Sequence, residues 1–110
     1  MKLVNRPWGD FKEFVKNKKC TVKILEIKSR QELSLQYHNK REEMWYFLDK
    51  AAVQLGDRKI KVSPGELVKI PKRKSHRIIS LGNKVRVLEI SIGHFSELDE
   101  KRLEDEYGRK

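Results

Sequence analysis

The stretch Gln36-Tyr-His-Asn-Lys-Arg-Glu-Glu-Met-Trp45 decides how this chain folds and what it can bind. Because side chains alternate between the two faces of a strand, Gln36 and His38 point the same way. A short turn then brings Glu43 back beside them, and His76 arrives from a separate hairpin. Two imidazoles, a carboxylate and an amide oxygen suit a divalent first-row metal. We therefore expect a Lewis-acid site that leaves positions for water or substrate.

Period-two alternation of apolar and polar residues dominates the chain, and short turns separate the alternating runs. Gly56-Asp57 has the length of a tight hairpin turn, and Ser63-Pro64-Gly65 and Gly82-Asn83 are further turns. Many short strands at regular spacing predict an all-β barrel or sandwich, in one domain that spans residues 1–110. The expected strands cover residues 11–15, 21–28, 32–38, 43–48, 52–55, 58–62, 67–70, 76–80 and 85–92.

The tail from Ser96 has a different pattern. Ser96 or Asp99 can serve as an N-cap, acidic residues follow, and Gly108 is a stop signal. These features predict a short C-terminal helix, which must dock on the barrel to persist.

The chain is strongly basic, with 26 Lys and Arg against 16 Asp and Glu and a formal net charge of +10. Such a protein attracts anions, including phosphorylated metabolites, nucleic acid and acidic membranes. The single cysteine, Cys20, excludes an intrachain disulfide and fits a reducing compartment. No apolar run approaches the ~18 residues of a membrane span, and the start lacks the apolar stretch of a signal peptide. We expect a cytoplasmic protein that does not associate with membranes.

The expected strand at residues 43–48 carries bulky apolar side chains on both faces. Met44, Tyr46 and Leu48 share the face that a single barrel would leave exposed to water. We therefore expect a partner subunit to cover this face in a homodimer. The alternative is cover by the N-terminal segment or by the tail helix.

The first ligand cluster resembles the first motif of the cupin superfamily. That motif places two ligands one residue apart and a Glu four or five positions on, as Gln36, His38 and Glu43 are placed. Two glycines that flank the general motif are missing, and Arg30 and Lys50 stand where they would fall.

The second cupin motif is similar to the segment from Gly65 through Pro71 to His76. Arg73 replaces the glycine that this motif carries between the proline and the histidine.

A closer resemblance, to the type II mannose-6-phosphate isomerases, covers nearly the whole chain. That family also forms the C-terminal domain of bifunctional isomerase/mannose-1-phosphate guanylyltransferases. No Gly-rich nucleotidyltransferase segment is present, so we do not expect guanylyltransfer. Met44 stands where the family usually has a histidine. The matching blocks are residues 6–9, 33–38, 41–45, 70–71 with 75–77, and 102–109.

The resemblance implies a cupin-type double-stranded β-helix, which is a jelly-roll barrel, with the short C-terminal helix. It implies a metal-dependent isomerase that interconverts mannose 6-phosphate and fructose 6-phosphate. The cofactor would be one divalent metal ion, zinc first, with Mn, Fe, Co or Ni as alternatives. The implied metal ligands are Gln36, His38, Glu43 and His76.

Three groups of cations remain open to two interpretations each. Arg41 is a substrate or transition-state contact by resemblance, or else a surface ion pair with Glu42. Arg102 reaches the site only if the tail folds over it, and otherwise pairs on the helix with an acid such as Glu106. The run Lys72, Arg73 and Lys74 is either a cationic rim that captures the substrate phosphate or a solvated charge run.

Two other functions compete with the isomerase. A metal-binding cupin with another activity or none, such as a sugar-binding or regulatory module, keeps the ligand set. A small nucleic-acid binder explains the basic charge but not the ligand spacing, and the few aromatic residues look buried. We expect a small phosphosugar as the partner molecule, and nucleic acid to be an unlikely one.

Overall fold

The computed structural model describes residues 1–94 and 96–104. Within these residues no helix is long and apolar enough to cross a membrane. The β-strands are β1 Lys2–Arg6, β2 Gly9–Glu13, β3 Cys20–Ile27, β4 Leu35–His38, β5 Arg41–Phe47, β6 Ala51–Leu55, β7 Arg58–Val62, β8 Leu67–Ile70, β9 His76–Ile79, β10 Val85–Gly93 and β11 Glu100–Glu104, with one 3₁₀ turn, η1, at Glu97–Asp99.

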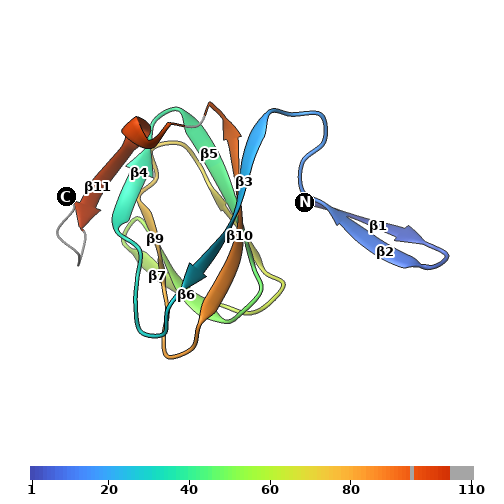
Figure 1. Ribbon diagram of the computed structural model, residues 1–110, viewed down its shortest axis with the longest axis horizontal. Helices are drawn as coiled ribbons and strands as arrows, with labels where there is room; N and C mark the ends of the chain where they lie inside the picture. The colour runs from blue at the N-terminus through green and yellow to red at the C-terminus, as the bar shows by residue number, and fades with distance from the viewer. Residues whose placement is uncertain (95, 105–110) are drawn as a thin grey trace.

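Two antiparallel sheets face each other and form the expected all-β barrel (Figure 1). One sheet has the strand order β3-β10-β5-β8, and the other has the order β11-β4-β9-β6-β7. The strands expected at residues 58–62 and 67–70 have those bounds in the structure. The strand expected at 32–38 shortens to β4, because Glu32 makes only an isolated bridge to Ile79. Strands β1 and β11 were not expected.

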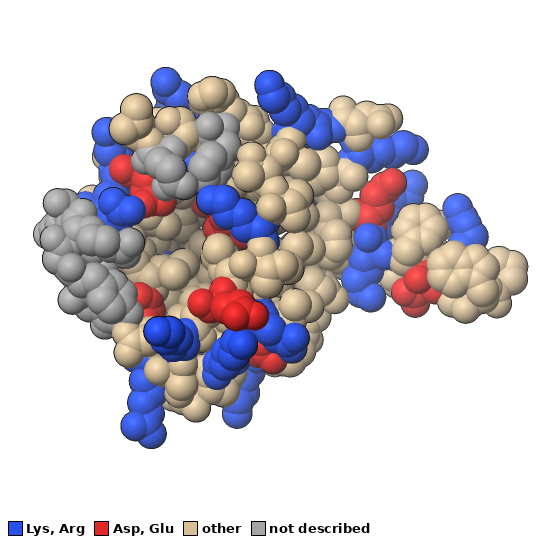
Figure 2. Space-filling view, viewed as in Figure 1, with Lys and Arg blue, Asp and Glu red and all other residues tan. Residues whose placement is uncertain are grey.

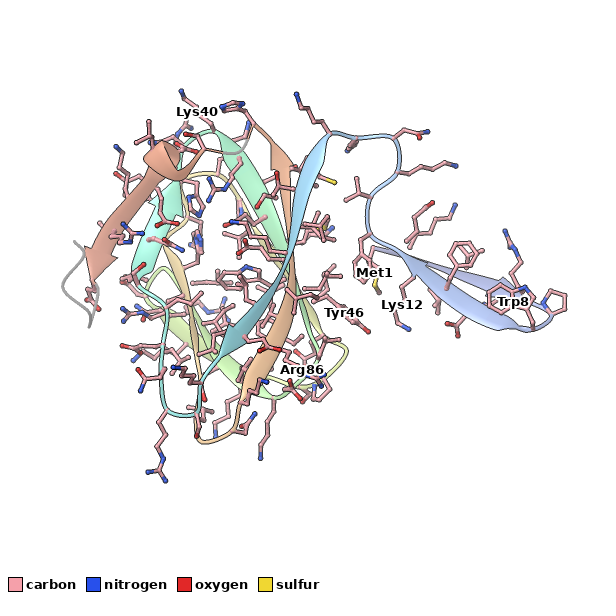
Figure 3. The ribbon with its side chains drawn as sticks, in the orientation of Figure 1. Met1, Trp8, Lys12, Lys40, Tyr46 and Arg86 are labelled. Carbon is pink, nitrogen blue, oxygen red and sulfur yellow. The ribbon has the colours of Figure 1, made fainter. Side chains whose placement is uncertain are left out.

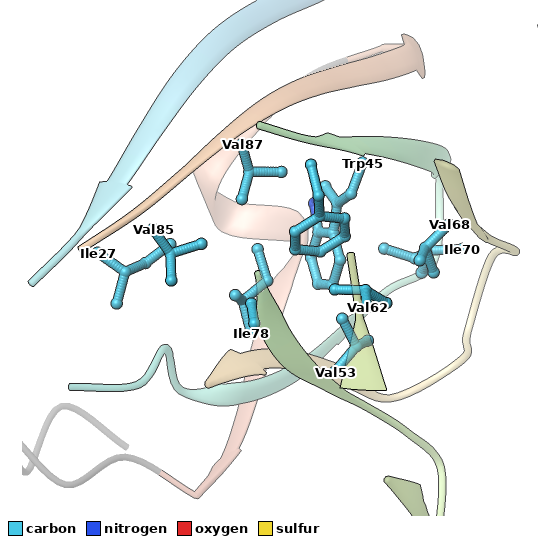
Figure 4. Packing of buried hydrophobic residues seen from close by; sticks show 11 residues of the cluster. Ile27, Trp45, Val53, Val62, Val68, Ile70, Ile78, Val85 and Val87 are labelled. Carbon is cyan, nitrogen blue, oxygen red and sulfur yellow. The ribbon is translucent and has the colours of Figure 1, made fainter. Parts of the chain in front are cut away.

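The inward faces of both sheets meet in one apolar core, shown in Figure 4. On β5 the inward positions are Arg41, Glu43, Trp45 and Phe47, because they alternate along the strand. Trp45 and Phe47 are fully buried in the core, whereas the two charged residues lie at one end of the barrel. The core members are Ile27, Trp45, Phe47, Ala51, Val53, Val62, Val68, Ile70, Ile78, Val85 and Val87.

The prediction of a C-terminal helix from Ser96 is wrong for the residues that the structure describes. After the single turn η1, the chain runs as β11 and pairs antiparallel with β4. The physical reason is that the edge of β4 offers unpaired backbone groups, and pairing with them outweighs weak local helix signals. Residues 105–110, which include the expected stop at Gly108, lie outside the described residues.

The outer face of β5 is partly covered by the chain's own N-terminal segment. Phe14 packs edge-on against Tyr46, with 5.0 Å between the ring centroids, and Met44 is only 7% exposed. Leu48 remains 37% exposed. The N-terminal segment therefore covers part of Tyr46 through Phe14, and the homodimer stays a prediction.

Two arginines adopt the left-handed backbone conformation that favours glycine. Arg30 has a φ of 63° and Arg73 a φ of 66°. Both stand where the cupin motifs carry glycine, so the chain keeps the turn geometry without the residue that suits it. Lys50 stands at the third such position and is not among the described residues with positive φ.

We expect Arg30→Gly to raise the free energy of unfolding by about 0.5–1 kcal/mol, because it relieves left-handed strain at an exposed site. The backbone N–H of Arg30, which donates to Ser80 Oγ at 3.0 Å, is retained. Urea denaturation measures the change. The matched control Lys50→Gly relieves no strain and should destabilise the protein by a similar amount. Equal destabilisation by both substitutions would contradict the prediction.

Candidate functional site

Three buried side chains from three strands meet at one end of the barrel. His38 comes from β4, Glu43 from β5 and His76 from β9. His38 Nε2 lies 2.9 Å from Glu43 Oε1, and His76 Nε2 lies 3.3 Å from the same oxygen. The two Nε2 atoms are 3.2 Å apart. The structure thus brings together three of the four residues expected to bind metal.

The spacing of these three atoms fits a single divalent cation. Ligand atoms about 2.1 Å from one ion lie about 3.0–3.4 Å apart when the angle between them is octahedral or tetrahedral. His76 Nδ1 lies 2.8 Å from the carbonyl oxygen of Lys74 and donates to it, which leaves a lone pair on Nε2. Lone pairs and a carboxylate that converge in a buried space need a cation or a proton between them.

Glu43 is held so that one oxygen faces the histidines. Ser91 Oγ donates to Glu43 Oε2 at 2.8 Å, and Oε1 is the atom nearest His38 and His76. Burial opposes ionisation, but hydrogen bonds and charges from the two histidines outweigh it and hold the pKa of Glu43 well below its ordinary value. Glu43 is therefore a carboxylate, the form that binds metal.

Gln36, the fourth expected ligand, lies on the same face of β4 as His38 and opposite His76 of β9. With its amide nitrogen turned toward Glu100, it donates to the two carboxylate oxygens at 2.8 and 3.1 Å. Gln36 thus lines the site and is tied to β11, and its role as a metal ligand stays a prediction.

Arg41 lies against the ligand residues and is only 3% exposed. Its Nη1 donates to the carbonyl oxygen of Ser96 at 3.0 Å, and its Nη2 lies 3.3 Å from His38 Nε2. Its Nε is 3.7 Å from Glu43 Oε2. The guanidinium is therefore part of the site and not an exposed group at the surface.

Arg102 reaches the site from a strand instead of a helix. β11 pairs with β4 so that Arg102 lies opposite Gln36, and Glu100 lies opposite His38. Directly paired residues share one face of a sheet, so both side chains join the ligand face. Arg102 and Glu100 form an ion pair, with 2.6 Å between Nη2 and Oε2.

Asp99, at the end of η1, fixes the turn between the two ligand strands. Its carboxylate accepts from the backbone N–H of Asn39 at 3.1 Å and of Lys40 at 2.9 Å. Burial opposes its ionisation, yet these two hydrogen bonds lower the pKa of Asp99 overall. The tail thereby sets the position of His38 relative to Glu43.

A cavity of about 230 Å³ opens beside the ligand residues. A larger hollow of about 580 Å³ lies on the other side of β5, but Glu43 is the one residue of the three that lines it. His38 and Glu43 both line the smaller cavity, together with Arg41, so we place the site there. Residues that line the smaller cavity are Lys23, Leu25, Leu33, Ser34, Gln36, His38, Arg41, Glu43, Glu89, Glu100 and Arg102.

The basic run Lys72, Arg73 and Lys74 is exposed in the loop between β8 and β9 and does not line this cavity. The backbone N–H of Arg73 donates to the carbonyl oxygen of His38 at 2.6 Å, so the loop lies directly beside a ligand strand. Its role in binding phosphate stays a prediction.

Glu89 is a site residue that the sequence reasoning missed. It lies on β10 opposite Trp45, whose indole Nε1 donates to Glu89 Oε2 at 3.0 Å. Burial and then the charge of Glu43 raise its pKa to about 7, against the opposing effects of the Trp45 hydrogen bond and of nearby cations. The signal was an acid on the same strand face as Val85 and Val87, a face expected to be apolar.

The family comparison matches residues 1–105 to the family described as mannose-6-phosphate isomerase C-terminal. Mannose-1-phosphate guanylyltransferase 2 of Escherichia coli O157:H7 is 32% identical over 94 residues, which are 84% of this chain and 20% of that protein. Mannose-1-phosphate guanylyltransferase ManC of Salmonella typhimurium is 29% identical over 96% of this chain and 23% of its own length. The chain therefore spans about one fifth of the length of these relatives.

Solved structures with the same fold are more distant in sequence. Oxalate decarboxylase from Bacillus subtilis has a TM-score of 0.71 at 24% identity, over 78% of this chain and 24% of that one. The capsular polysaccharide assembling protein CapF of Staphylococcus aureus has a TM-score of 0.68 at 21% identity, over 94% of this chain and 34% of its own. The fold, the convergence of His38, Glu43 and His76, and the family match agree, and this chain belongs to the mannose-6-phosphate isomerase C-terminal family of cupins.

Proposed function

We propose that this domain is a metal-dependent aldose–ketose isomerase that interconverts mannose 6-phosphate and fructose 6-phosphate. The observation that carries the proposal is the convergence of His38, Glu43 and His76 beside a cavity lined by both acids and cations. One putative sugar phosphate isomerase, from Acidithiobacillus ferrooxidans, shares the fold at a TM-score of 0.63 and 22% identity, over 68% of this chain and 51% of that one. That likeness supports the fold alone.

The proposed cofactor is zinc, because two imidazoles and a carboxylate are ligands that it commonly takes with a position left open. Mn, Fe, Co and Ni accept the same ligands. When bound, such an ion supplies a Lewis acid for the substrate carbonyl and hydroxyl oxygens. His38, Glu43 and His76 would hold it, with Gln36 as the proposed fourth ligand.

Arg41 is proposed to stabilise the oxyanion that develops during enolisation. Its guanidinium is buried and its Nη2 lies 3.3 Å from His38 Nε2. A substrate oxygen that binds beside His38 therefore meets a fixed positive charge in a site of low dielectric constant. Arg102 lines the same cavity and is the second proposed substrate contact.

Glu89 is proposed as the group that moves the proton between carbons. Its carboxylate removes the proton from C2 of the aldose, the C–H electron pair becomes the C1–C2 double bond of an enediol, and the carbonyl electrons move to O1, which takes a proton from solvent. O2 then gives its proton to solvent and forms the C2–O2 double bond, while C1 receives the proton from Glu89, which gives the ketose. Trp45 Nε1 donates to Glu89 Oε2 at 3.0 Å, which orients the carboxylate for this transfer.

Lys72, Arg73 and Lys74 are proposed to attract the substrate phosphate to the mouth of the site. They are exposed, and their loop is hydrogen-bonded to the backbone of His38. Their contribution should weaken as salt increases, because exposed charges are screened.

A coupled assay of mannose 6-phosphate conversion tests the proposal. We expect turnover that is lost on treatment with EDTA and restored by added zinc, with glucose 6-phosphate as a comparison substrate of the opposite C2 configuration. Folded, metal-loaded protein that leaves mannose 6-phosphate unchanged would refute the isomerase. The domain would then be a metal-binding cupin with another activity or none.

A further inference from the structure

Glu100 is an acidic residue of the cavity wall that has no role in the proposed chemistry. It lies on β11, which runs beside β4 at the margin of the barrel (Figure 1), and it pairs in register with His38. Its side chain is 12% exposed and lines the cavity of about 230 Å³. Lys40, in the turn between β4 and β5, marks this end of the barrel in Figure 3. A carboxylate that is largely buried beside the metal ligands calls for a physical reason.

The carboxylate of Glu100 is held from two strands. Within β11, Arg102 Nη2 lies 2.6 Å from Glu100 Oε2 in an ion pair. From β4, the amide nitrogen of Gln36 donates to Glu100 Oε1 at 2.8 Å and to Oε2 at 3.1 Å. Glu100 is therefore a fixed acceptor against which the amide of Gln36 is oriented.

The two ends of the Gln36 amide have opposite hydrogen-bonding character, because the nitrogen donates and the oxygen accepts. A carboxylate has no proton to donate, so Glu100 pairs with the nitrogen end alone. Ser34 Oγ lies 3.3 Å from the same end, but a hydroxyl both donates and accepts and does not select an orientation. The other end of the amide faces donors, which suits an oxygen. The contacts of Gln36 thus agree on one orientation, and Glu100 anchors it.

The orientation matters because a metal ion binds the oxygen of an amide and not its nitrogen. Gln36 shares the ligand face of β4 with His38 and lies opposite His76 of β9. In the sheet β4 lies between β11 and β9. Tying the nitrogen to β11 leaves the oxygen available to the ligand residues.

We propose that Glu100 is a positioning residue that orients the amide of Gln36 for metal binding, so that the last strand of the barrel sets the affinity of the site for its ion. The inference rests on the metal-binding part of the proposed function. Groups that hold a metal ligand by its second polar atom change metal affinity by about 10–100-fold. Glu100 would act through Gln36 and not by touching the ion.

The test is the dissociation constant of zinc for the full chain, measured by isothermal titration calorimetry with zinc chloride. We expect about 10-fold weaker binding in Glu100→Gln, because a glutamine there also donates and no longer selects the nitrogen end of Gln36. Gln36→Ala should weaken binding at least as much. In the Gln36→Ala background, Glu100→Gln should change the dissociation constant by less than about twofold, because no amide is left to orient. Circular dichroism establishes that each variant is folded.

A second acid controls for the loss of charge. Acidic and basic side chains lie beside each other on the face of the molecule in Figure 2, and removing any acid changes the potential that a cation meets. Glu42 is exposed on β5, next to the ligand Glu43 in sequence but on the other face of the strand. Glu42→Gln removes the same charge and should keep the dissociation constant of zinc within about twofold of the wild type, since exposed charges are screened.

Three results would each overturn the proposal. Equal weakening by Glu42→Gln and Glu100→Gln would assign the effect to net charge. An undiminished effect of Glu100→Gln in the Gln36→Ala background would show that Glu100 acts without Gln36. Unchanged zinc binding in Gln36→Ala would show that Gln36 is not a ligand. The isomerase fails on a separate observation, because zinc-loaded protein without turnover would leave these affinities as they are.

Discussion

Replacing Glu89 with glutamine is expected to abolish isomerisation while making the metal-free fold more stable at pH 8. Turnover should fall about 10²–10⁴-fold, because glutamine cannot carry the proton between C2 and C1. The amide keeps an oxygen that accepts from Trp45 Nε1, now 3.0 Å from Glu89 Oε2, so the cavity wall should persist. The exchange of the C2 proton with solvent, followed by NMR, should be lost in parallel.

The stability effect follows from the raised pKa of Glu89. Because the pKa in the folded state is about 7 and the ordinary value is 4.5, folding favours the protonated carboxyl. The contribution of the protonated carboxyl to the free energy of unfolding is complete below the ordinary pKa, and it is lost as the pH rises through 7. Above that pH the buried carboxylate costs up to about 3 kcal/mol, which Glu89→Gln removes. Urea denaturation in EDTA should show the gain at pH 8 and little at pH 4.5.

Glu26→Gln is the matched control, since Glu26 is an exposed acid on the outside of the neighbouring strand β3. It should change neither turnover nor the pH dependence of stability. Wild-type turnover in Glu89→Gln, with its metal content intact, would remove Glu89 from the mechanism and leave the rest of the site unaffected.

Loss of bound metal is the second large effect, expected for His38→Ala and for His76→Ala. Each substitution removes one of three atoms that lie within 3.3 Å of one another, and an ion left with fewer protein ligands dissociates. Wild-type protein should contain about one zinc per chain, measured by elemental analysis. Zinc at 100 times its dissociation constant should stabilise the wild type by about 2.7 kcal/mol and the variants by almost nothing.

His94 provides the matched control, because it is the third histidine of the chain and is exposed at the end of β10. His94→Ala should keep both the metal and the stabilisation by zinc. Stoichiometric metal in the His38→Ala, His76→Ala double variant would show that the ion binds elsewhere.

The barrel and the convergence of His38, Glu43 and His76 could be predicted from the sequence, because both depend on alternation along strands. Gln36 and His38 share a face by simple periodicity, and the turn before Glu43 is short enough to fix its return. The structure of the tail could not be predicted from alternation along a strand. Its capping residues and acids suggest a helix locally, and only the open edge of β4, a feature of the folded barrel, selects a strand instead.

Glu89 escaped prediction for a related reason. In a chain rich in charged residues, an acid on an alternating strand is expected to be a solvated side chain. Its burial depends on Trp45 across the sheet, and the pairing register that places them together is not visible before the fold is known. Similarly, the positive φ values of Arg30 and Arg73 could be suspected only from the glycines of the cupin motif.

The pairing of β11 with β4 also bears on the time at which the pocket becomes complete. Ribosomes deliver chains from the N-terminus, and the segments made first can fold first. A nascent chain that has emerged through β10 carries His38, Glu43 and His76, but it lacks the wall that Glu100 and Arg102 build. Such an intermediate could already capture an ion, whereas its sugar pocket would close only when the last strand docks.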